Sequence, residues 1–304
     1  MTLSSARSPG DVFSVETRMN GLTRWTSGAT GRLKASRFVE PEVVTVTSFD
    51  GLSVSGLLYR PDSRKFPGRR PVVVHFHGGP EGQSRPQFLR AWNFLLDELG
   101  MALLYPNVRG SEGYGKRFLT LDDGIRREDS VSDVGAFLDW IGRQPSLDAD
   151  KVAVYGGSYG GYLVLASMIR FGDRLRCGID VVGISNFVTF LNNTSGYRRD
   201  LRRVEYGDER DVKMREFLQR ISPLTNVTRI KRPMLIIQGA NDPRVPATEA
   251  SQMLTAIRGS GAEAWYMLAK DEGHGFQKKS NRDAQNAAIA AFLKLKLAGQ
   301  RLDQ

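Results

Sequence analysis

A serine framed by glycines is the feature of this chain best suited to chemistry. Residues 156–160, Gly-Gly-Ser-Tyr-Gly, have the Gly-x-Ser-x-Gly spacing of a nucleophile elbow, a strained turn that lifts a serine oxygen clear of a β-sheet. Residues 152–155 before it have the composition of a short buried strand, and an apolar run at 162–169 follows it. The spacing therefore predicts a strand, a turn that exposes Ser158, and a helix whose N-terminal amides lie beside the hydroxyl.

A serine nucleophile needs a base, and the base needs a carboxylate that orients it. Where a nucleophile elbow joins a strand to a helix, the order along the chain is serine, acid, histidine. Of the three histidines in the chain, only His274 follows the elbow, in a glycine-flanked loop after the last predicted strand. Asp242 is the only carboxylate in the loop 239–246, which follows the preceding strand. Taken singly, Asp242 could be a turn residue before proline and His274 a surface residue, but their order and placement predict a catalytic triad with Ser158.

An oxyanion hole requires two backbone donors beside the nucleophile. The amide of Tyr159, the residue after the serine, is the first, and we expect the second from Gly78 in the His-Gly-Gly-Pro loop at 77–80. His77 precedes the elbow in the chain, so we interpret it as a structural member of that loop, and His75 as a core histidine whose hydrogen bonds are satisfied. A metal held by these two histidines would lack further ligands, because no cysteine or third histidine accompanies them. We expect neither a metal nor a cofactor.

Strand and helix patterns alternate along most of the chain. A hairpin of residues 43–49 and 52–59, turning at Asp50-Gly51, comes first. It is followed by predicted strands at 72–76, 101–105, 152–155, 179–184, 234–238 and 264–268, and by predicted helices at 86–99, 130–142, 162–169, 248–258 and from 281. Crossovers of this kind produce parallel strands with ligands at their carboxyl ends. The sequence therefore predicts an α/β fold with a mostly parallel central sheet of about eight strands and helices on both faces.

Two segments differ from this alternation. In residues 1–36, alternating stretches at 11–17 and 22–26 flank Asn20-Gly21, which is typical of a β-hairpin. A lone hairpin is marginally stable in water, so this one must pack on something or be partly mobile. The second segment is a long polar insertion at 186–229, for which the pattern predicts a helix at 211–221.

The bulk composition is that of a globular protein with a basic surface. The 304 residues include 43 Lys and Arg against 33 Asp and Glu, a formal net charge of +10. The basic residues occur in scattered pairs, without the continuous stripe or reading motif of a nucleic-acid-binding protein. Residues 1–12 lack the apolar core of a secretory signal, and no run of about eighteen apolar residues exists. We expect a cytoplasmic protein that binds neither nucleic acid nor membranes.

Five motifs together make the chain similar to a known family. They are His-Gly-Gly-Pro at 77–80, Asn-Val-Arg-Gly-Ser-Glu-Gly-Tyr-Gly at 107–115, Gly-Gly-Ser-Tyr-Gly-Gly at 156–161, Asp-Pro-Arg-Val-Pro at 242–246 and Gly-His-Gly-Phe at 273–276. This set resembles the catalytic domain of the prolyl oligopeptidase family, in particular its acylaminoacyl-peptidase-like branch. The resemblance implies an α/β-hydrolase fold and a serine peptidase or esterase that needs no cofactor. It also implies the roles of nucleophile for Ser158, base for His274 and orienting acid for Asp242, with the Gly78 and Tyr159 amides as oxyanion donors.

The stretch before the catalytic motifs departs from that family. Members that resemble this chain carry a β-propeller that caps the active site, whereas here only residues 1–36 precede the hydrolase motifs and look like the last propeller hairpin. We therefore expect a propeller-like remnant at 1–36 and a catalytic domain at 37–304 with an open active site. The expected activity proceeds through an acyl-enzyme on small acyl esters, on short or N-acylated peptides, or on both. An apolar edge without its cap leaves self-association into a homo-oligomer open.

Two alternatives remain at this point. In related peptidases an arginine from the region of the 186–229 insertion binds a substrate carbonyl, so the resemblance implies that Arg198, Arg199 or Arg202 contacts the substrate. A solvated helix face is an equally good interpretation of these arginines. The second alternative concerns function: an α/β-hydrolase scaffold can be catalytically silent and act as a binding module, because fold does not determine function. No triad member is missing from the sequence, which favours an enzyme.

Overall fold

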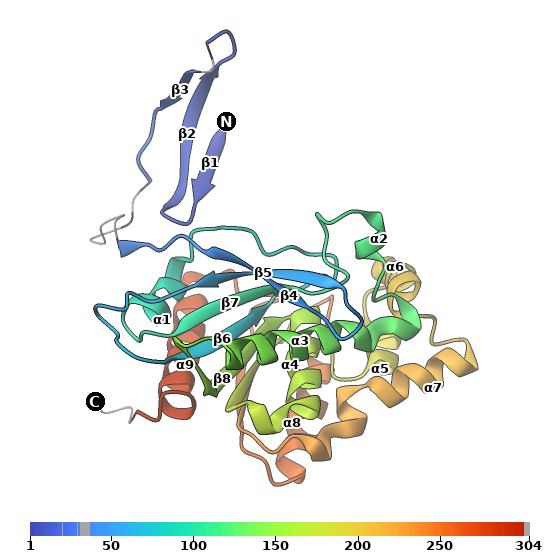
Figure 1. Cartoon of the computed structure of the whole chain (residues 1–304). Coiled ribbons are helices and arrows are strands. Elements are labelled where there is room, and N and C mark those ends of the chain that lie inside the picture. Colours follow the sequence, from blue (N-terminus) through green and yellow to red (C-terminus); the bar gives the residue numbers. More distant parts are fainter. Residues whose placement is uncertain (20, 29, 31–36, 301–304) are drawn as a thin grey trace.

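An eight-stranded sheet in the order β11-β10-β9-β8-β6-β7-β5-β4 forms the centre of the molecule (Figure 1). The computed structural model describes residues 1–19, 21–28, 30 and 37–300. The strands of this sheet are β4 (Glu42–Thr47), β5 (Ser53–Tyr59), β6 (Arg70–Phe76), β7 (Ala102–Asn107), β8 (Leu147–Gly157), β9 (Cys177–Val181), β10 (Met234–Gly239) and β11 (Ala264–Ala269). β5 pairs antiparallel with β4 and β7, and the other neighbouring strands pair parallel. The predicted mostly parallel sheet and the hairpin at its edge are confirmed.

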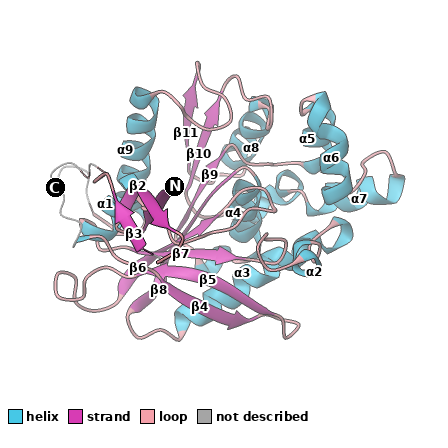
Figure 2. Cartoon of the chain, turned by 90° about the horizontal axis from the view of Figure 1, so that it is seen from above, coloured by secondary structure: helices cyan, strands magenta, loops and turns pink. Residues whose placement is uncertain are grey.

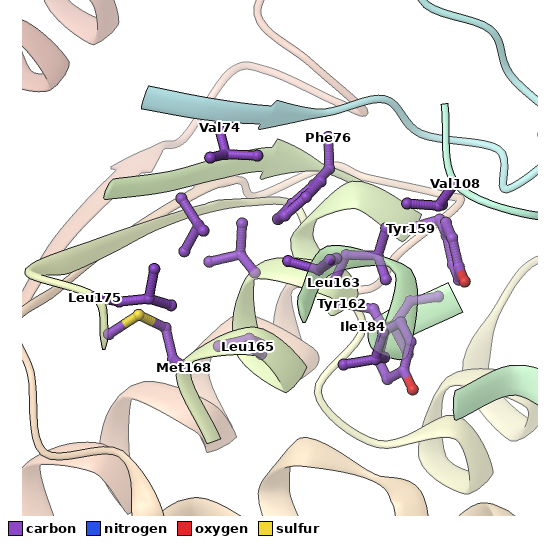
Figure 3. Close-up of a cluster of buried hydrophobic side chains, with 14 of the residues drawn as sticks. Val74, Phe76, Val108, Tyr159, Tyr162, Leu163, Leu165, Met168, Leu175 and Ile184 are labelled. Atoms are coloured by element: carbon purple, nitrogen blue, oxygen red, sulfur yellow. The ribbon is translucent and has the colours of Figure 1, made fainter. Parts of the chain in front are cut away.

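Helices cover both faces of this sheet (Figure 2). Side chains of a strand point alternately to the two faces, so a strand buried on both faces is apolar throughout. In β6, Val72 and Val74 join one core cluster and Val73 joins the other. The first cluster contains side chains of α3 (Arg127–Gly142), α4 (Tyr159–Arg170), α7 (Val212–Ile221) and α8 (Ala247–Gly259), and the second contains side chains of α1 (Asn93–Asp97) and α9 (Lys279–Lys296). Figure 3 shows the first cluster, in which Val74 and Phe76 lie among side chains of α4.

A separate three-stranded sheet at the N-terminus stands away from the central sheet (Figure 1). It consists of β1 (Thr2–Ser5), β2 (Ser8–Glu16) and β3 (Gly21–Arg24). The antiparallel pairing of β2 with β3 confirms the predicted hairpin, whose turn residue Asn20 lies outside the described residues. β1, which pairs with β2, was not predicted from the sequence. The buried carboxylate of Asp11 holds this sheet together by accepting hydrogen bonds from the Arg24 side chain and from the Gly28 amide.

The prediction of one helix over residues 86–99 is wrong in its bounds. The structure has a 3-10 helix at Arg90–Trp92 followed by the short helix α1. Arg90 has a φ of 49°, which lies in the left-handed region. A right-handed helix cannot run through a residue in that conformation, so no continuous helix extends from residue 86.

The 186–229 insertion contains more helix than the sequence predicted. It forms α5 (Phe187–Asn193), α6 (Gly196–Tyr206), the correctly predicted α7, and a 3-10 helix at Pro223–Arg229. α5 packs against both α6 and α7, and the three helices lie together at one side of the molecule (Figures 1 and 2). The buried residues of α6 are Arg202, Glu205 and Tyr206. A charged buried face lacks the apolar periodicity on which helix prediction depends, which explains why α6 was missed.

The remaining helical elements are short. In the described ranges they include α2 (Lys116–Leu119) and 3-10 helices at Gly124–Arg126 and Gly172–Arg174. Within the described ranges, no helix combines the length and the apolar character that crossing a membrane requires.

Candidate active site

Ser158 lies on a sharp turn between β8 and α4. Its φ of 59° and ψ of −120° form a conformation that residues other than glycine rarely adopt. The turn packs closely: a Cβ at Gly156 would lie 2.3 Å from the carbonyl oxygen of Gly160, and one at Gly160 would lie 2.5 Å from the carbonyl oxygen of Phe76. The Ser158 amide donates to the Val181 carbonyl at 2.9 Å, which ties the turn to β9. The predicted strand, turn and helix are confirmed, and the two framing glycines are required by the packing.

Asp242 and His274 are in direct contact. The Nδ1 atom of His274 lies 2.7 Å from Oδ2 of Asp242. The other carboxylate oxygen of Asp242 accepts hydrogen bonds from the amides of Arg244 at 2.8 Å and Val245 at 3.0 Å. The Asp242 side chain is completely buried and that of His274 is 13% exposed. A carboxylate at Nδ1 favours the tautomer with its proton on Nδ1, so Nε2 is left to accept a proton.

Ser158 lies on the same edge of the sheet as this pair. β8, β9 and β10 are parallel neighbours, so the elbow after β8 and the Asp242 loop after β10 meet at their carboxyl ends. His274 follows β11, which pairs parallel with β10. Among the described residues, no hydrogen bond joins the Ser158 hydroxyl to His274. The structure thus brings the predicted acid and base together and puts the predicted nucleophile at the same edge.

The Gly78 loop lies directly against the elbow. A Cβ at Gly78 would lie 3.3 Å from the Cβ of Ser158 and 3.0 Å from the carbonyl oxygen of Gly157. Tyr159 is the first residue of α4, where backbone amides have no partner inside the helix. Within the described residues, neither the Gly78 amide nor the Tyr159 amide donates a hydrogen bond to another group. Both amides therefore remain able to bind an anion beside Ser158.

The two early histidines have separate surroundings. His77 has Nδ1 2.9 Å from the Gly78 carbonyl and Nε2 2.8 Å from the Ser111 hydroxyl, and burial lowers its pKa. These contacts agree with the interpretation of His77 as a structural member of the Gly78 loop. His75 packs against the rings of Trp92, Tyr105 and Tyr155, and burial lowers its pKa to about 3. His75 therefore lies in the core as the sequence suggested, but the expectation that its hydrogen bonds are satisfied is wrong, because its buried Nδ1 atom has no partner among the described residues.

The three candidate substrate-binding arginines lie on α6 but differ in their partners. Arg202 is buried and forms ion pairs with Glu205 and, at 3.3 Å, with Glu81. Arg199 donates through Nη2 to the carbonyls of Asn192 and Thr194, so it serves the α5–α6 corner. Arg198 forms no ion pair with any described carboxylate. Of the three, only Arg198 has a guanidinium without an assigned structural role.

Two residues near the predicted triad were missed by sequence reasoning. Arg244 follows Asp242 by two residues and, within the described chain, pairs with no carboxylate. Glu272 is buried and closes the loop that carries His274, because its carboxylate accepts hydrogen bonds from the amides of Gln277 at 2.9 Å and Lys278 at 2.8 Å. These hydrogen bonds, that of the Gln277 amide first, hold the pKa of Glu272 below its usual range. The only signal in the sequence was that Arg244 and Glu272 lie in the loops that carry the candidate residues Asp242 and His274.

A third buried carboxyl group lies under the elbow. Asp180 in β9 is paired in register with Gly156 of β8. A Cβ at Gly161 would lie 2.3 Å from its Oδ1 atom, so the carboxyl group is enclosed by backbone. Burial raises the pKa of Asp180 to about 7. This group is therefore poorly able to hold a charge near neutral pH.

The chain is similar to a known protein family and to several curated proteins. Residues 86–300 match the model of the prolyl oligopeptidase family. The chain is 33% identical to the dipeptidyl aminopeptidase BIII of Pseudoxanthomonas mexicana over 98% of this chain and 44% of that protein. It is 34% identical to the dipeptidyl peptidase family member 6 of Caenorhabditis elegans over 75% of this chain and 31% of that protein. The chain therefore spans less than half the length of these two relatives.

Solved structures show the same fold at lower sequence identity. A puromycin hydrolase superposes with a TM-score of 0.91 at 24% identity, over 99% of this chain and 45% of that one. A Pyrococcus horikoshii acylaminoacyl peptidase superposes with a TM-score of 0.88 at 21% identity, over 100% of this chain and 48% of that one. These likenesses confirm the predicted α/β-hydrolase fold. The match of residues 86–300 to the family model shows that this chain belongs to the prolyl oligopeptidase family, whose members are serine peptidases.

Proposed function

We propose that this chain is the hydrolase part of a serine peptidase that works through an acyl-enzyme on Ser158. The observation that carries the proposal is the Asp242–His274 contact at the same sheet edge as the strained serine. A buried carboxylate that fixes an imidazole within reach of a serine on an elbow is the arrangement that activates a hydroxyl for attack. A surface loop with a purely structural role would not need the 2.7 Å contact between Asp242 and His274.

The proposed reaction uses His274 as the proton carrier. The Ser158 oxygen attacks the substrate carbonyl carbon while its proton moves to Nε2 of His274. The amides of Gly78 and Tyr159 bind the oxyanion, and Asp242 stabilises the imidazolium. Collapse breaks the bond to the leaving amine or alcohol, which takes the proton from His274. Water then attacks the acyl-enzyme by the same route, and the acid and free Ser158 are released.

The proposed substrates are short or N-acylated peptides and small acyl esters. Support for peptides comes from the relatives, which include an acylamino-acid-releasing enzyme of Homo sapiens at 26% identity over 76% of this chain. Support for esters is chemical, because an ester needs only the nucleophile, the oxyanion donors and an acyl pocket. Small esters are therefore the activity least dependent on further recognition surfaces.

We propose in addition that residues 1–36 belong to a propeller-like domain and residues 37–304 form the catalytic domain. The sheet of β1 to β3 stands away from the central sheet and has few buried side chains (Figure 1). Its exposed apolar side chains are Leu3, Val12, Val15 and Leu22, with Trp25 just after β3. Further strands packed beside them would cover this apolar surface.

Labelling with a fluorophosphonate probe tests the proposed nucleophile. We expect one label per chain at Ser158, located by peptide mapping, and no label in the Ser158→Ala variant. A panel of p-nitrophenyl esters beside aminoacyl and acyl-aminoacyl p-nitroanilides then separates the activities. Ester turnover without anilide cleavage would assign an esterase, and anilide cleavage would assign a peptidase.

The alternative is a catalytically silent hydrolase scaffold that binds a partner. One observation favours it: in the described residues, the Ser158 hydroxyl makes no hydrogen bond to His274. Such contacts often tighten only when a substrate is bound, so the observation does not outweigh the Asp242–His274 pair. Absence of labelling in a folded protein would overturn the enzyme proposal in favour of the scaffold.

A further inference from the structure

The side chain of Tyr159 ends in a buried hydrogen-bonded cluster. Tyr159 is the first residue of α4, and its side chain is fully buried. Its hydroxyl donates to Oδ2 of Asp122 at 3.1 Å and lies 2.8 Å from the hydroxyl of Ser130 in α3. The residue whose amide is a candidate oxyanion donor is therefore held at the far end of its side chain by two other segments of the chain.

A buried ion pair completes this cluster. Nη1 of Arg127 in α3 donates to the same Oδ2 atom of Asp122, and neither side chain is more than 1% exposed. The Arg127 guanidinium also lies over the Tyr159 ring, 5.2 Å from its centroid. Tyr159 is thus contacted both at its hydroxyl and at its ring. We call Asp122, Arg127, Ser130 and Tyr159 the Asp122 cluster.

The Asp122 cluster also reaches the loop of the second candidate donor. A Cβ at Gly110 would lie 2.1 Å from Oδ1 of Asp122, so the carboxylate packs directly on the backbone there. The next residue, Ser111, has its hydroxyl 2.8 Å from Nε2 of His77, which precedes Gly78. One carboxylate is therefore connected to both candidate oxyanion donors, through the tyrosine hydroxyl on one side and through the Gly110 backbone on the other.

Helix α6 supports the Asp122 cluster from outside. The guanidinium of the cluster donates through Nη2 to the Glu205 carbonyl at 2.9 Å. α6 is itself attached at two points. The Ser195 hydroxyl donates to the carbonyl of Pro243, next to the candidate acid, at 2.6 Å. Arg202 lies 3.3 Å from Glu81, which follows the candidate oxyanion loop. The cluster is therefore enclosed by elements that are fixed to one another.

A buried ion pair is weak evidence for a role in stability alone. Taking two charges out of water costs about as much as their attraction returns, so an apolar pair of similar size would serve the fold equally well. A fully buried polar network does, in contrast, hold its atoms in one arrangement. That property matters where catalysis depends on donors that are in place before the charge develops.

We propose that Asp122 and Arg127 are positioning residues for the candidate oxyanion hole. They act on the Tyr159 amide through the tyrosine side chain and on the Gly78 amide through the backbone at Gly110. In this role they act through other residues and do not contact the substrate. Because the hole binds a charge that forms only in the transition state, disturbing the cluster should lower kcat and leave KM nearly unchanged. The proposal deepens the proposed hydrolase function and rests on it.

Tyr159→Phe tests the link between the cluster and the amide, because it removes the hydroxyl and keeps the ring. We expect kcat for a p-nitrophenyl ester to fall by about 10- to 100-fold, with KM nearly constant. Tyr162→Phe is the matched control. Tyr162 is a similarly buried tyrosine one turn further along α4 (Figure 3), and its hydroxyl makes no hydrogen bond with another described group. Tyr162→Phe should change kcat little.

A boronic acid inhibitor probes the oxyanion hole itself. The boron of n-butylboronic acid forms a bond with the Ser158 oxygen and places one of its own oxygens where the oxyanion would lie. We expect the inhibition constant to rise in Tyr159→Phe by the same factor by which kcat/KM falls, because both depend on the two amides. A purely structural role would lower the unfolding temperature without this proportional change.

Asp122→Asn tests whether the cluster acts as a unit. Asparagine can still accept from the tyrosine hydroxyl, but it lacks the charge that holds Arg127 in place. We expect kcat to fall at least as far as in Tyr159→Phe. The double variant should fall no further than Asp122→Asn alone, because both changes act through one contact. If Asp122→Asn does not fold, Tyr159→Phe and its boronate constant decide the question.

The outcomes separate the positioning role from the hydrolase function. If the wild type hydrolyses the ester and Tyr159→Phe matches Tyr162→Phe in kcat and in the boronate constant, the positioning role is overturned and the hydrolase stands. The same holds if kcat falls in Tyr159→Phe and the boronate constant does not change. If the folded wild type is not labelled by a fluorophosphonate and hydrolyses no ester, the proposed function fails and the positioning role fails with it.

Discussion

The carboxyl edge of the sheet and helix α6 hold their charged side chains in different ways. At the sheet edge, backbone amides fix the carboxylates of Asp242 and Glu272. In α6, side chains fix each other, and Arg202 lies buried between Glu205 and Glu81. A carboxylate held by the backbone keeps its place when a neighbouring side chain changes. A buried ion pair depends on both partners, so its loss should affect stability more than chemistry.

Asp242→Asn should produce the largest effect, which should be on kcat and not on stability. The asparagine oxygen can still accept from the Arg244 and Val245 amides, so the loop should keep its shape. Its amide group cannot support the catalytic tautomer of His274, and kcat should fall by about 10⁴-fold. Steady-state turnover of a p-nitrophenyl ester would measure kcat, and a thermal melt would measure whether the fold is kept. A loss of activity below tenfold would show that Asp242 is not the orienting acid.

Arg202→Met, in contrast, should affect stability more than turnover. Removing the guanidinium leaves Glu205 buried with Arg127, at 3.8 Å, as its remaining cation. We expect the free energy of unfolding to fall by about 3 kcal/mol, measured by urea denaturation. Turnover of a neutral ester by the folded variant should fall far less than in Asp242→Asn. An unchanged denaturation midpoint would contradict the view that α6 depends on this ion pair.

Glu272→Gln tests whether the His274 loop needs both of its backbone hydrogen bonds. Glutamine offers one oxygen in place of two, so either the Gln277 or the Lys278 amide loses its acceptor. A loosened loop should displace the imidazole and lower kcat by about 10- to 100-fold, with KM nearly constant. The neighbouring exposed Asp271→Asn is the control and should change kcat little. If both variants behave alike, Glu272 does not position His274.

Asp180→Asn should have the smallest effect on turnover, and its effect on stability should depend on pH. Burial raises the folded-state pKa of Asp180 from 3.8 to about 7, so between these values the folded state keeps a proton that the unfolded state releases. The free energy of unfolding of the wild type should therefore fall as pH rises through this window, by about 1.4 kcal/mol for each pH unit. The variant cannot titrate at this position, so its stability relative to the wild type should increase between pH 4 and pH 8. Denaturation curves of both proteins at pH 4, 6 and 8 would measure this difference in stability. A difference that does not change with pH would contradict the raised pKa.

The sequence predicted best where backbone geometry leaves a pattern in the residues. Glycines 156 and 160 are required by close packing, and the alternation of strands with helices placed Asp242 and His274 at the carboxyl edge. The fold class and the contact between acid and base could therefore be expected from spacing alone. The distance between Ser158 and His274 is not set by such a pattern, because it depends on the conformation of the loop at 271–278.

Prediction failed where side chains determine the local structure. α6 was missed because its buried face contains Arg202 and Glu205, which resemble surface residues in a sequence. The same charged composition concealed which of the three arginines lacks an ion pair among the described residues. Arg199 donates to the nearby carbonyls of Asn192 and Thr194, and Arg202 pairs with Glu205 and the distant Glu81, which residue types alone do not reveal. The helix predicted at 86–99 failed because a left-handed φ at Arg90 is not encoded by hydropathy. In each case a contact or a backbone angle, not the residue type, decided the outcome.

The attachment of α6 to both candidate catalytic loops has a consequence for how this protein could change. Ser195 holds the loop of the acid, and Arg202 holds the segment that follows the Gly78 loop. A substitution that shifts the helix would move both loops together, so selectivity and turnover would vary as one trait. New specificities should therefore arise most readily from exchanges of side chains that leave the axis of α6 where it is.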